Sequence, residues 1–333
     1  MANKEIGDFT VANTPFNGSE LIHVVQSGNS RRTTIQDVSS AFGGFRNLIF
    51  NGDMKIDQRN AGSSQTVTAG AALAYCVDRF YAYCTGANVT GQRVSNTGAS
   101  AYRYRFTGAA SVTAIGFGQR IESINSRHLA GKTATLSILT KNSLLTTVTW
   151  SAYYANTENT FGTLASPTRT LINTGSFTVT STEAQYSTNI SIPSAATTGI
   201  EIVLSVGAQT SGTWEIGDVQ LELGTVATQF ERRPIGLETF MCMRYYLKTI
   251  IPTFRGYNVS ASNVLSSQLS LSVPMRSAPT GAIVTQPSAT SNITGSIALT
   301  VESNTYFIVY FTGTAAGQSY YSSDGVATFS SEL

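Results

Sequence analysis

The sequence predicts a mainly β protein with four parts: an N-terminal hairpin with a short helix, a central antiparallel β-sandwich of the jelly-roll type, a linking helix and a small C-terminal β domain. Three observations predict this class. Asp, Glu, Lys and Arg make up only 12% of the 333 residues, against about 25% in a typical soluble protein. Apolar and polar residues alternate with a period of two over much of the chain, as they do in half-buried strands. Gly, Asn and Ser are frequent between these stretches, where they suit the turns that join strands.

The length favours more than one compact unit, because domains commonly have about 100–200 residues. We expect an attachment segment over residues 1–45, the sandwich over residues 46–235, and a helix plus a β domain over residues 236–333. The last part has its own alternating strands and is long enough for a small core.

Residues 1–45 contain a predicted hairpin and a predicted helix. The hairpin covers residues 21–33, with its turn at Ser-Gly-Asn. The helix begins near Thr34, which forms a capping box with Asp37, and ends before two glycines. Such a small piece buries too little surface to be stable alone, so we expect it to fold against a partner or against copies of itself.

The sandwich begins at residue 46, where the period-two pattern becomes regular. Tyr102, Tyr104 and Phe106 alternate with Arg103 and Arg105. This predicts aromatic side chains on the inner face of a strand and solvated guanidinium groups on its outer face.

A change of register near the end of the sandwich predicts a β-bulge. Trp214 and Ile216 share one parity, whereas Val219 and Leu221 share the other, so the bulge is expected between them. We expect residues 47–59 and 214–223 to lie adjacent, as the first and last strands that close the sandwich. This arrangement would bring Asp53 near Asp218.

The C-terminal part begins with a predicted helix after Pro234, which marks its start. Leu237, Met241 and Tyr245 lie on one helical stripe, with Phe240 and Met243 nearby. Residues 305–313 form a nearly continuous apolar run and predict a strand that is buried on both faces.

Charge and motifs exclude several classes of function. The net charge of +2 is small, and no basic run alternates with aromatic residues, so nucleic acid is not an expected partner. The N-terminal residues do not resemble a signal peptide and no long apolar run is present, so we expect synthesis in the cytoplasm and no membrane span. Three cysteines without zinc-type spacing predict buried free thiols. They are Cys76, Cys84 and Cys242.

Several stretches together resemble bacteriophage structural proteins of the tail-fibre, head-fibre and receptor-binding type. Their order along the chain carries the resemblance more than any single stretch, and they cover most of residues 20–280. The stretches are VVQSGNSRRTTIQDVSSAF, NLIFNGDMKIDQR, GFGQRIESINSRHLAGKTATLSILTK, WEIGDVQLELGTVATQFERRPIGLETFMCMRYY and VPMRSAPT.

The resemblance implies a virion protein with a jelly roll that looks like a carbohydrate-binding module. It implies a homotrimer, attachment to other phage structural proteins through residues 1–45, and binding to host cell-surface polysaccharide. The alternative is a purely structural decoration protein of the capsid or tail, without glycan binding. The location in either case is the virion.

The expected ligand site combines aromatic rings, which stack on sugars, with amides that bind hydroxyl groups. Trp150, Tyr153 and Tyr154 are the candidates, because they cluster at a strand end before a polar loop. Their alternative role is in the core or at a subunit contact. Tyr320 and Tyr321 are secondary candidates.

The resemblance also implies a structural calcium ion. Asn51, Asp53 and Asp218 match the motif positions that hold it, and hard oxygen ligands are what calcium requires. Their alternative role is in stabilising turns and the bulge. Met54 and Lys55 depart from the pattern, because an acidic ligand is often found there.

We do not expect an enzyme. A glycosidase needs two carboxylates about 5–10 Å apart across a cleft. Candidate carboxylates lie in no recognisable acid/base motif and no GxSxG nucleophile motif is present. These carboxylates are Asp78, Glu122, Glu158 and Glu201.

Overall fold

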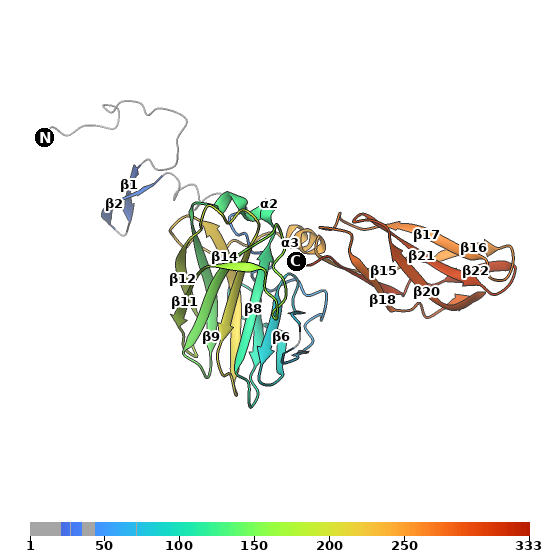
Figure 1. Cartoon of the computed structure of the whole chain (residues 1–333), viewed down its shortest axis with the longest axis horizontal. Helices are drawn as coiled ribbons and strands as arrows, with labels where there is room; N and C mark the ends of the chain where they lie inside the picture. Colours follow the sequence, from blue (N-terminus) through green and yellow to red (C-terminus); the bar gives the residue numbers. More distant parts are fainter. Residues whose placement is uncertain (1–20, 27, 35–43, 71) are drawn as a thin grey trace, which may run out of the picture.

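The computed structural model describes residues 21–26, 28–34, 44–70 and 72–333. In Figure 1 a small hairpin, a β-sandwich and a second, elongated β domain follow one another. The predicted mainly β class is therefore confirmed. In the part of the chain that the structure describes, no helix is long and apolar enough to cross a membrane.

The N-terminal hairpin forms as predicted. Strands β1 (Leu21–Gln26) and β2 (Asn29–Thr34) pair antiparallel. Gly28 adopts a positive φ of 76° in the turn, a conformation that glycine takes without steric cost. The helix predicted to follow Thr34 lies outside the described residues.

The sandwich consists of two six-stranded antiparallel sheets. Sheet 1 has the order β11-β10-β13-β8-β5-β4, and sheet 2 has the order β12-β9-β14-β7-β6-β3. The strands of sheet 1 are β4 (Ala74–Tyr75), β5 (Tyr81–Thr85), β8 (Ala114–Ile121), β10 (Thr147–Ala155), β11 (Arg169–Thr178) and β13 (Ile200–Val206). Those of sheet 2 are β3 (Gln65–Val67), β6 (Val89–Ser95), β7 (Tyr102–Thr107), β9 (Thr133–Asn142), β12 (Ala184–Ser191) and β14 (Thr213–Leu223).

Alternating apolar side chains from both sheets fill one core, as the period-two pattern predicts. Phe117 of β8 stacks on Tyr104 of β7, with ring centroids 5.2 Å apart, and on Phe80 at 4.6 Å. Phe106 stacks on Trp214 at 5.4 Å. The three cysteines are buried and free, as predicted.

The predicted contact between residues 47–59 and β14 is present. The Leu48 amide donates to the Leu221 carbonyl at 2.9 Å, and the Val219 amide donates to the Gly52 carbonyl at 3.0 Å. The register of β14 shifts between Gly217 and Gln220, which confirms the bulge. The prediction that residues 47–59 form a strand is wrong, because this segment consists of turns and is held largely by side chains.

Arg103 corrects the expectation of a solvated outer face on β7. Its side chain is only 1% exposed and pairs with Glu183 at 2.7 Å and Asp218 at 3.4 Å. Arg105, by contrast, is 40% exposed and pairs with Glu215 at 2.8 Å. The two guanidinium groups share a face, but only Arg103 is covered by the segment around Glu183.

Short helices connect the parts. Helix α2 (Ser123–Ser126) and the 3-10 turn η2 (Arg127–Leu129) follow β8. Helix α3 (Ile235–Met243) begins after Pro234, as predicted. Its buried residues are Glu238 and Cys242, and the Glu238 carboxylate accepts a hydrogen bond from the Asn51 backbone amide at 2.6 Å. Of the predicted stripe, Leu237 and Met241 are half-buried, and Tyr245 is buried but lies beyond the end of the helix.

The C-terminal part is a second β unit with its own hydrophobic core. It contains three three-stranded sheets, with the orders β15-β23-β18, β16-β22-β19 and β17-β21-β20. Its strands are β15 (Tyr246–Ile250), β16 (Phe254–Asn258), β17 (Val264–Ser270), β18 (Thr280–Thr285), β19 (Thr290–Ser291), β20 (Ile293–Val301), β21 (Tyr306–Gly313), β22 (Gly317–Tyr321) and β23 (Val326–Ser330).

Strand β21 corrects the prediction of a strand buried on both faces. Phe307, Val309 and Phe311 are buried, whereas Tyr306 and Tyr310 on the other face are half-buried. The apolar run is continuous because tyrosine and isoleucine also occupy the outer face, where no further layer covers them fully.

The two β units are joined by a cationic and aromatic contact. The Arg59 guanidinium lies 3.6 Å from the ring centroid of Tyr246, and Arg79 lies 3.4 Å from that of Tyr245. Both arginines pair with Glu332, which follows β23. Residues 331–333 are therefore held between the sandwich and the second β unit.

Candidate functional site

The structure separates the three predicted ligand residues on β10. Trp150 faces the core and is 5% exposed. A methyl group at Gly175 of β11 would lie 2.7 Å from Trp150 Cζ2, so the indole packs directly on that glycine. Tyr154 also packs against the core. Tyr153 has the opposite parity and lies on the outer face of sheet 1, because successive residues of a strand point to opposite faces.

The outer face of sheet 1 carries a tyrosine that sequence reasoning overlooked. Tyr83 of β5 pairs with Gly116 of β8 in the strand register. A methyl group at Gly116 would lie 2.1 Å from Tyr83 Cζ, so the ring lies across the glycine. Tyr83 remains only half-buried. Its ring thus rests on the sheet and keeps part of its surface in contact with solvent.

Tyr81 repeats this arrangement two residues earlier. It pairs with Gly118, and a methyl group there would lie 2.5 Å from its phenol oxygen. Tyr81, however, is only 1% exposed. The signal for both contacts was present in the sequence, since two alternating tyrosines face two alternating glycines of the stretch GFGQR.

A buried carboxylate organises the centre of this face. Glu201 of β13 is fully buried. It accepts a hydrogen bond from the Tyr81 hydroxyl at 2.6 Å and from Arg120 Nε at 2.8 Å, and it pairs with Arg169. The Arg169 guanidinium also lies 4.0 Å from the ring centroid of Tyr153. Glu201 therefore holds Arg169, and Arg169 holds Tyr153 in place.

Electrostatics keep the phenols of this face neutral. Burial raises the pKa of Tyr83, although the nearby Arg169 opposes the shift. Burial and the charge of Glu201 raise the pKa of Tyr81 well above its usual value. Both hydroxyl groups are therefore protonated at neutral pH. The Tyr81 hydroxyl donates to the Glu201 carboxylate.

Small hydroxyl side chains and one apolar side chain complete the face. Ser151 and Thr174 lie opposite each other on β10 and β11, with hydroxyl oxygens 2.9 Å apart. Leu171 is 49% exposed beside Tyr153. We call Tyr83, Ser151, Tyr153, Arg169 and Thr174 the sheet 1 face. It combines aromatic surface with neutral donors and one immobilised guanidinium.

Comparison with known proteins shows similarity to solved β-sandwich structures. One is a family 61 carbohydrate-binding module in complex with β-1,4-galactotriose, with 12% identity and a TM-score of 0.32, covering 54% of this chain and 99% of that chain. Another is the CBM22-2 xylan-binding domain of Paenibacillus barcinonensis Xyn10C, with 14% identity and a TM-score of 0.29, covering 43% of this chain and 91% of that chain.

A third similar structure is the enzymatically active domain of tailspike protein 4 of bacteriophage CBA120. It has 17% identity and a TM-score of 0.32, and the match covers 54% of this chain but only 21% of that chain. No protein-family model and no curated protein matches the sequence. At these identities the comparisons assign no ligand to this chain.

The residues predicted to hold calcium are engaged with other groups. The Asn51 side-chain amide donates to the carbonyls of Ile56 and Asp78, at 2.8 and 3.0 Å. Its Oδ1 accepts the Ile56 amide at 2.8 Å. Asn51 thus uses its side-chain nitrogen and its Oδ1 to stabilise the turn.

Cations already neutralise the two predicted carboxylate ligands. Asp53 pairs with Lys55 at 3.0 Å. Asp218 pairs with Arg103 at 3.4 Å and Arg232 at 3.6 Å. In the described part of the chain, no group of three His, Cys, Asp or Glu residues is arranged to hold a metal ion. This donor set does not fit a calcium ion.

The carboxylates that could serve glycosidase chemistry also have structural partners. Glu201 is held by the tyrosine and the two arginines described above, and Glu122 pairs with Arg244 at 3.0 Å. Glu158 accepts a hydrogen bond from the Ser123 hydroxyl at 2.6 Å. Asp78 is buried and accepts the Gln58 amide at 3.0 Å, and burial raises its pKa to about 6. These contacts give each of the four carboxylates a role in stabilising the fold.

Proposed function

We propose that this chain binds saccharide through the sheet 1 face. The half-buried ring of Tyr83, which rests on Gly116 of the neighbouring strand, is the observation that carries the proposal. A pyranose ring presents a face of C–H groups to an aromatic ring and hydroxyl groups around its edge. Arg169 lies near Tyr83, and Ser151 and Thr174 lie on the same face at β10 and β11, where they could bind hydroxyl groups of further units of a longer glycan.

The rigid side chains of the sheet 1 face support a role in ligand binding. Arg169 is fixed between Glu201 and the Tyr153 ring, so little side-chain entropy is lost when a ligand binds. Tyr81 makes the same contact with Gly118 but is 1% exposed, whereas Tyr83 keeps part of its surface in solvent. The partial exposure of Tyr83 therefore favours this ring, and not Tyr81, as the one that contacts a ligand.

At the level of the particle, we propose a homotrimeric virion appendage of a bacteriophage. Residues 1–45 would dock on other phage structural proteins, and the sandwich would bind host surface polysaccharide. This part of the proposal is supported by the motif resemblance and by the low content of charged residues, which suits contacts between copies. In a trimer, once one site has bound a polymeric glycan, the other two sites are held near it at a high effective concentration, so three weak sites bind tightly together.

A surface between the two β units is suited to such contacts between copies. Ile124 and Phe240 are 69% and 57% exposed. With Phe50, Met241 and Val273 they line a hollow of about 530 Å³. Analytical ultracentrifugation of the full chain tests the assembly. A trimer is expected, and a monomer at all concentrations would contradict the proposal.

A bacterial glycan array probed with the full chain tests saccharide binding. The wild type and Tyr310→Ala are expected to bind the same glycans, because Tyr310 lies on the outer face of β21 in the other β unit. Tyr83→Ala is expected to lose about tenfold or more in affinity. Equal binding of neutral glycans by Tyr83→Ala and the wild type would refute the site. No binding to any glycan by a folded multimer would favour a structural decoration role.

A further inference from the structure

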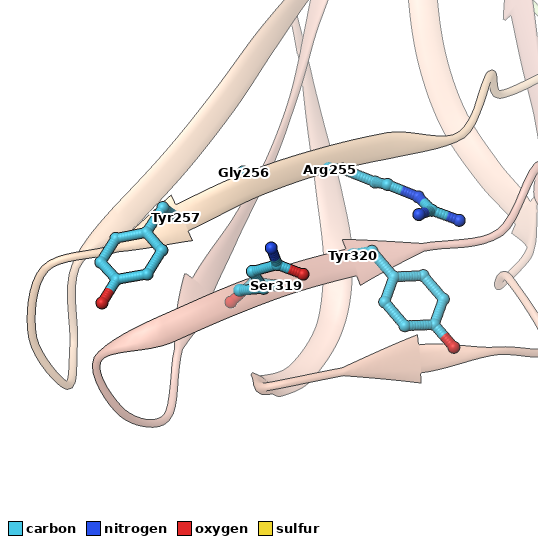
Figure 2. Close-up of a pocket in the computed structure, with 6 residues that line it drawn as sticks. Arg255, Gly256, Tyr257, Ser319 and Tyr320 are labelled. Carbon is cyan, nitrogen blue, oxygen red and sulfur yellow. The ribbon is translucent and has the colours of Figure 1, made fainter.

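A second hollow lies on the outer face of the sheet β16-β22-β19, in the C-terminal β unit. It has a volume of about 500 Å³ and is lined by Arg255, Gly256, Tyr257, Gln318, Ser319 and Tyr320. Figure 2 shows Tyr257 and Tyr320 at opposite ends of the hollow. In Figure 1 these strands lie at the end of the unit away from the sandwich, so a large ligand can reach them.

Strand register explains how the four large side chains come together. Arg255 and Tyr257 alternate with glycine and share the outer face of β16. On β22, Tyr320 lies opposite Arg255, and Gln318 lies opposite Tyr257. Tyr257 and Tyr320 are thus diagonal neighbours, a placement that separates residues by about 7–8 Å. This spacing leaves room for one sugar ring between or across the phenols.

The inner face of the same strands gives the outer face a fixed support. Tyr321 is 1% exposed and packs on Phe311, with ring centroids 5.7 Å apart. Asn258 donates to the Ser319 hydroxyl at 2.6 Å. The strands that carry the hollow are therefore anchored in the core, although the hollow itself is open. Tyr257 is 64% exposed.

Arg255 is the group that sets the ligand class. Its guanidinium lies 5.6 Å from the Tyr320 ring centroid. Among the described residues it has no carboxylate partner, and no Asp or Glu lines the hollow. The buried arginines of the sandwich, such as Arg103 and Arg120, pair with carboxylates. A guanidinium held over a ring but without an anion is ready to bind one, and its fork matches a carboxylate.

We propose that this hollow binds a saccharide unit that carries a carboxylate, such as a uronic acid. The carboxylate pairs with Arg255, the sugar ring packs on Tyr257 or Tyr320, and the Gln318 amide binds a hydroxyl group. This second site stands independently of the sheet 1 face. It adds selectivity for acidic polysaccharide. The sheet 1 face does not supply this selectivity, because its phenols are neutral and the charge of Arg169 is neutralised by Glu201.

Titration calorimetry of the full chain tests the proposal with two probes: an oligogalacturonate and the same oligosaccharide with its carboxyl groups reduced to alcohols. The acidic probe is expected to bind, and the reduced probe to bind about tenfold or more weakly. Arg255→Gln is expected to lose about ten- to a hundred-fold in affinity for the acidic probe. Added salt should weaken this binding, because the pair is exposed to solvent.

Matched variants distinguish binding in this hollow from a general effect of charge and from binding at the sheet 1 face. Lys248→Gln removes one positive charge from an exposed position of β15 in the same unit and should leave the affinity unchanged. Tyr83→Ala removes the central ring of the sheet 1 face and should also leave the affinity for the acidic probe unchanged. An unfolded Arg255→Gln protein is recognised by its melting curve, and Tyr257→Ala then serves instead, with an expected loss of about tenfold.

Three outcomes would overturn the proposal. Equal binding of acidic and reduced probes would remove the role of the carboxylate. Full binding by folded Arg255→Gln and Tyr257→Ala variants would place the ligand elsewhere. Binding of a single-stranded oligonucleotide in preference to the acidic saccharide would assign the aromatic and cationic side chains to bases and phosphates.

Discussion

Replacing Glu201 by alanine is predicted to destabilise the sandwich. The carboxylate is fully buried and accepts contacts from Tyr81, Arg120 and Arg169. Its removal leaves two guanidinium groups and one phenol without their acceptor. Breaking a buried ion pair from one side costs about 3–5 kcal/mol. The two arginine side chains are 8% and 14% exposed and regain some hydration, so a loss near the lower limit, about 3 kcal/mol, is expected.

Urea denaturation followed by tryptophan fluorescence measures this loss in the sandwich itself. Both tryptophans, Trp150 and Trp214, are buried in its core, so the signal does not report on the C-terminal unit. Glu201→Gln is the matched control, because it keeps the shape and one acceptor oxygen, and an intermediate loss is expected. A loss below about 1 kcal/mol for Glu201→Ala would refute the reasoning, since that is the range of exposed ion pairs.

Three further predictions concern buried groups and the metal question. Burial raises the pKa of Asp78 from 3.8 to about 6. The protonated carboxyl therefore stabilises the folded state below about pH 4, and this stabilisation, roughly 3 kcal/mol in the free energy of unfolding, is lost as the pH rises through about 6. Asp78→Asn should remove this part of the pH dependence in denaturant titrations; identical pH profiles would contradict it. The three buried thiols, including Cys76, whose pKa burial raises to about 12, should react with Ellman's reagent only after unfolding, and fast reaction in the native state would contradict their burial. Calcium or a chelator should leave the melting temperature unchanged, because Lys55 already neutralises Asp53; stabilisation by calcium that Asp53→Asn abolishes would show a calcium site there.

The period-two pattern was sufficient to predict strands and the bulge of β14. It identified which residues alternate and where the parity changes, because both follow from the local geometry of a strand. The partner of each strand was not contained in that pattern. The contact of Tyr83 with Gly116 joins strands more than thirty residues apart, and the burial of Arg103 depends on Glu183 in a distant segment.

The candidate site illustrates the same limit. Trp150 and Tyr153 were grouped because they are close in sequence, but strand alternation puts them on opposite faces of sheet 1. Residues of one face come from β5, β8, β10, β11 and β13, which only the sheet order brings together. The calcium ligands were suggested by matched motif positions, whereas the neutralising Arg103 and Arg232 lie outside those positions.

The most direct test of saccharide binding compares Tyr83→Ala and Gly116→Ala by titration with the neutral glycan that binds best on the array. Gly116→Ala keeps every aromatic ring but displaces Tyr83, since the added methyl group would lie 2.1 Å from Tyr83 Cζ. We predict that both variants stay folded and lose about tenfold or more in affinity, whereas Tyr83→Phe keeps most of it. Unchanged affinity in folded Tyr83→Ala and Gly116→Ala proteins would contradict the sheet 1 face as the binding site.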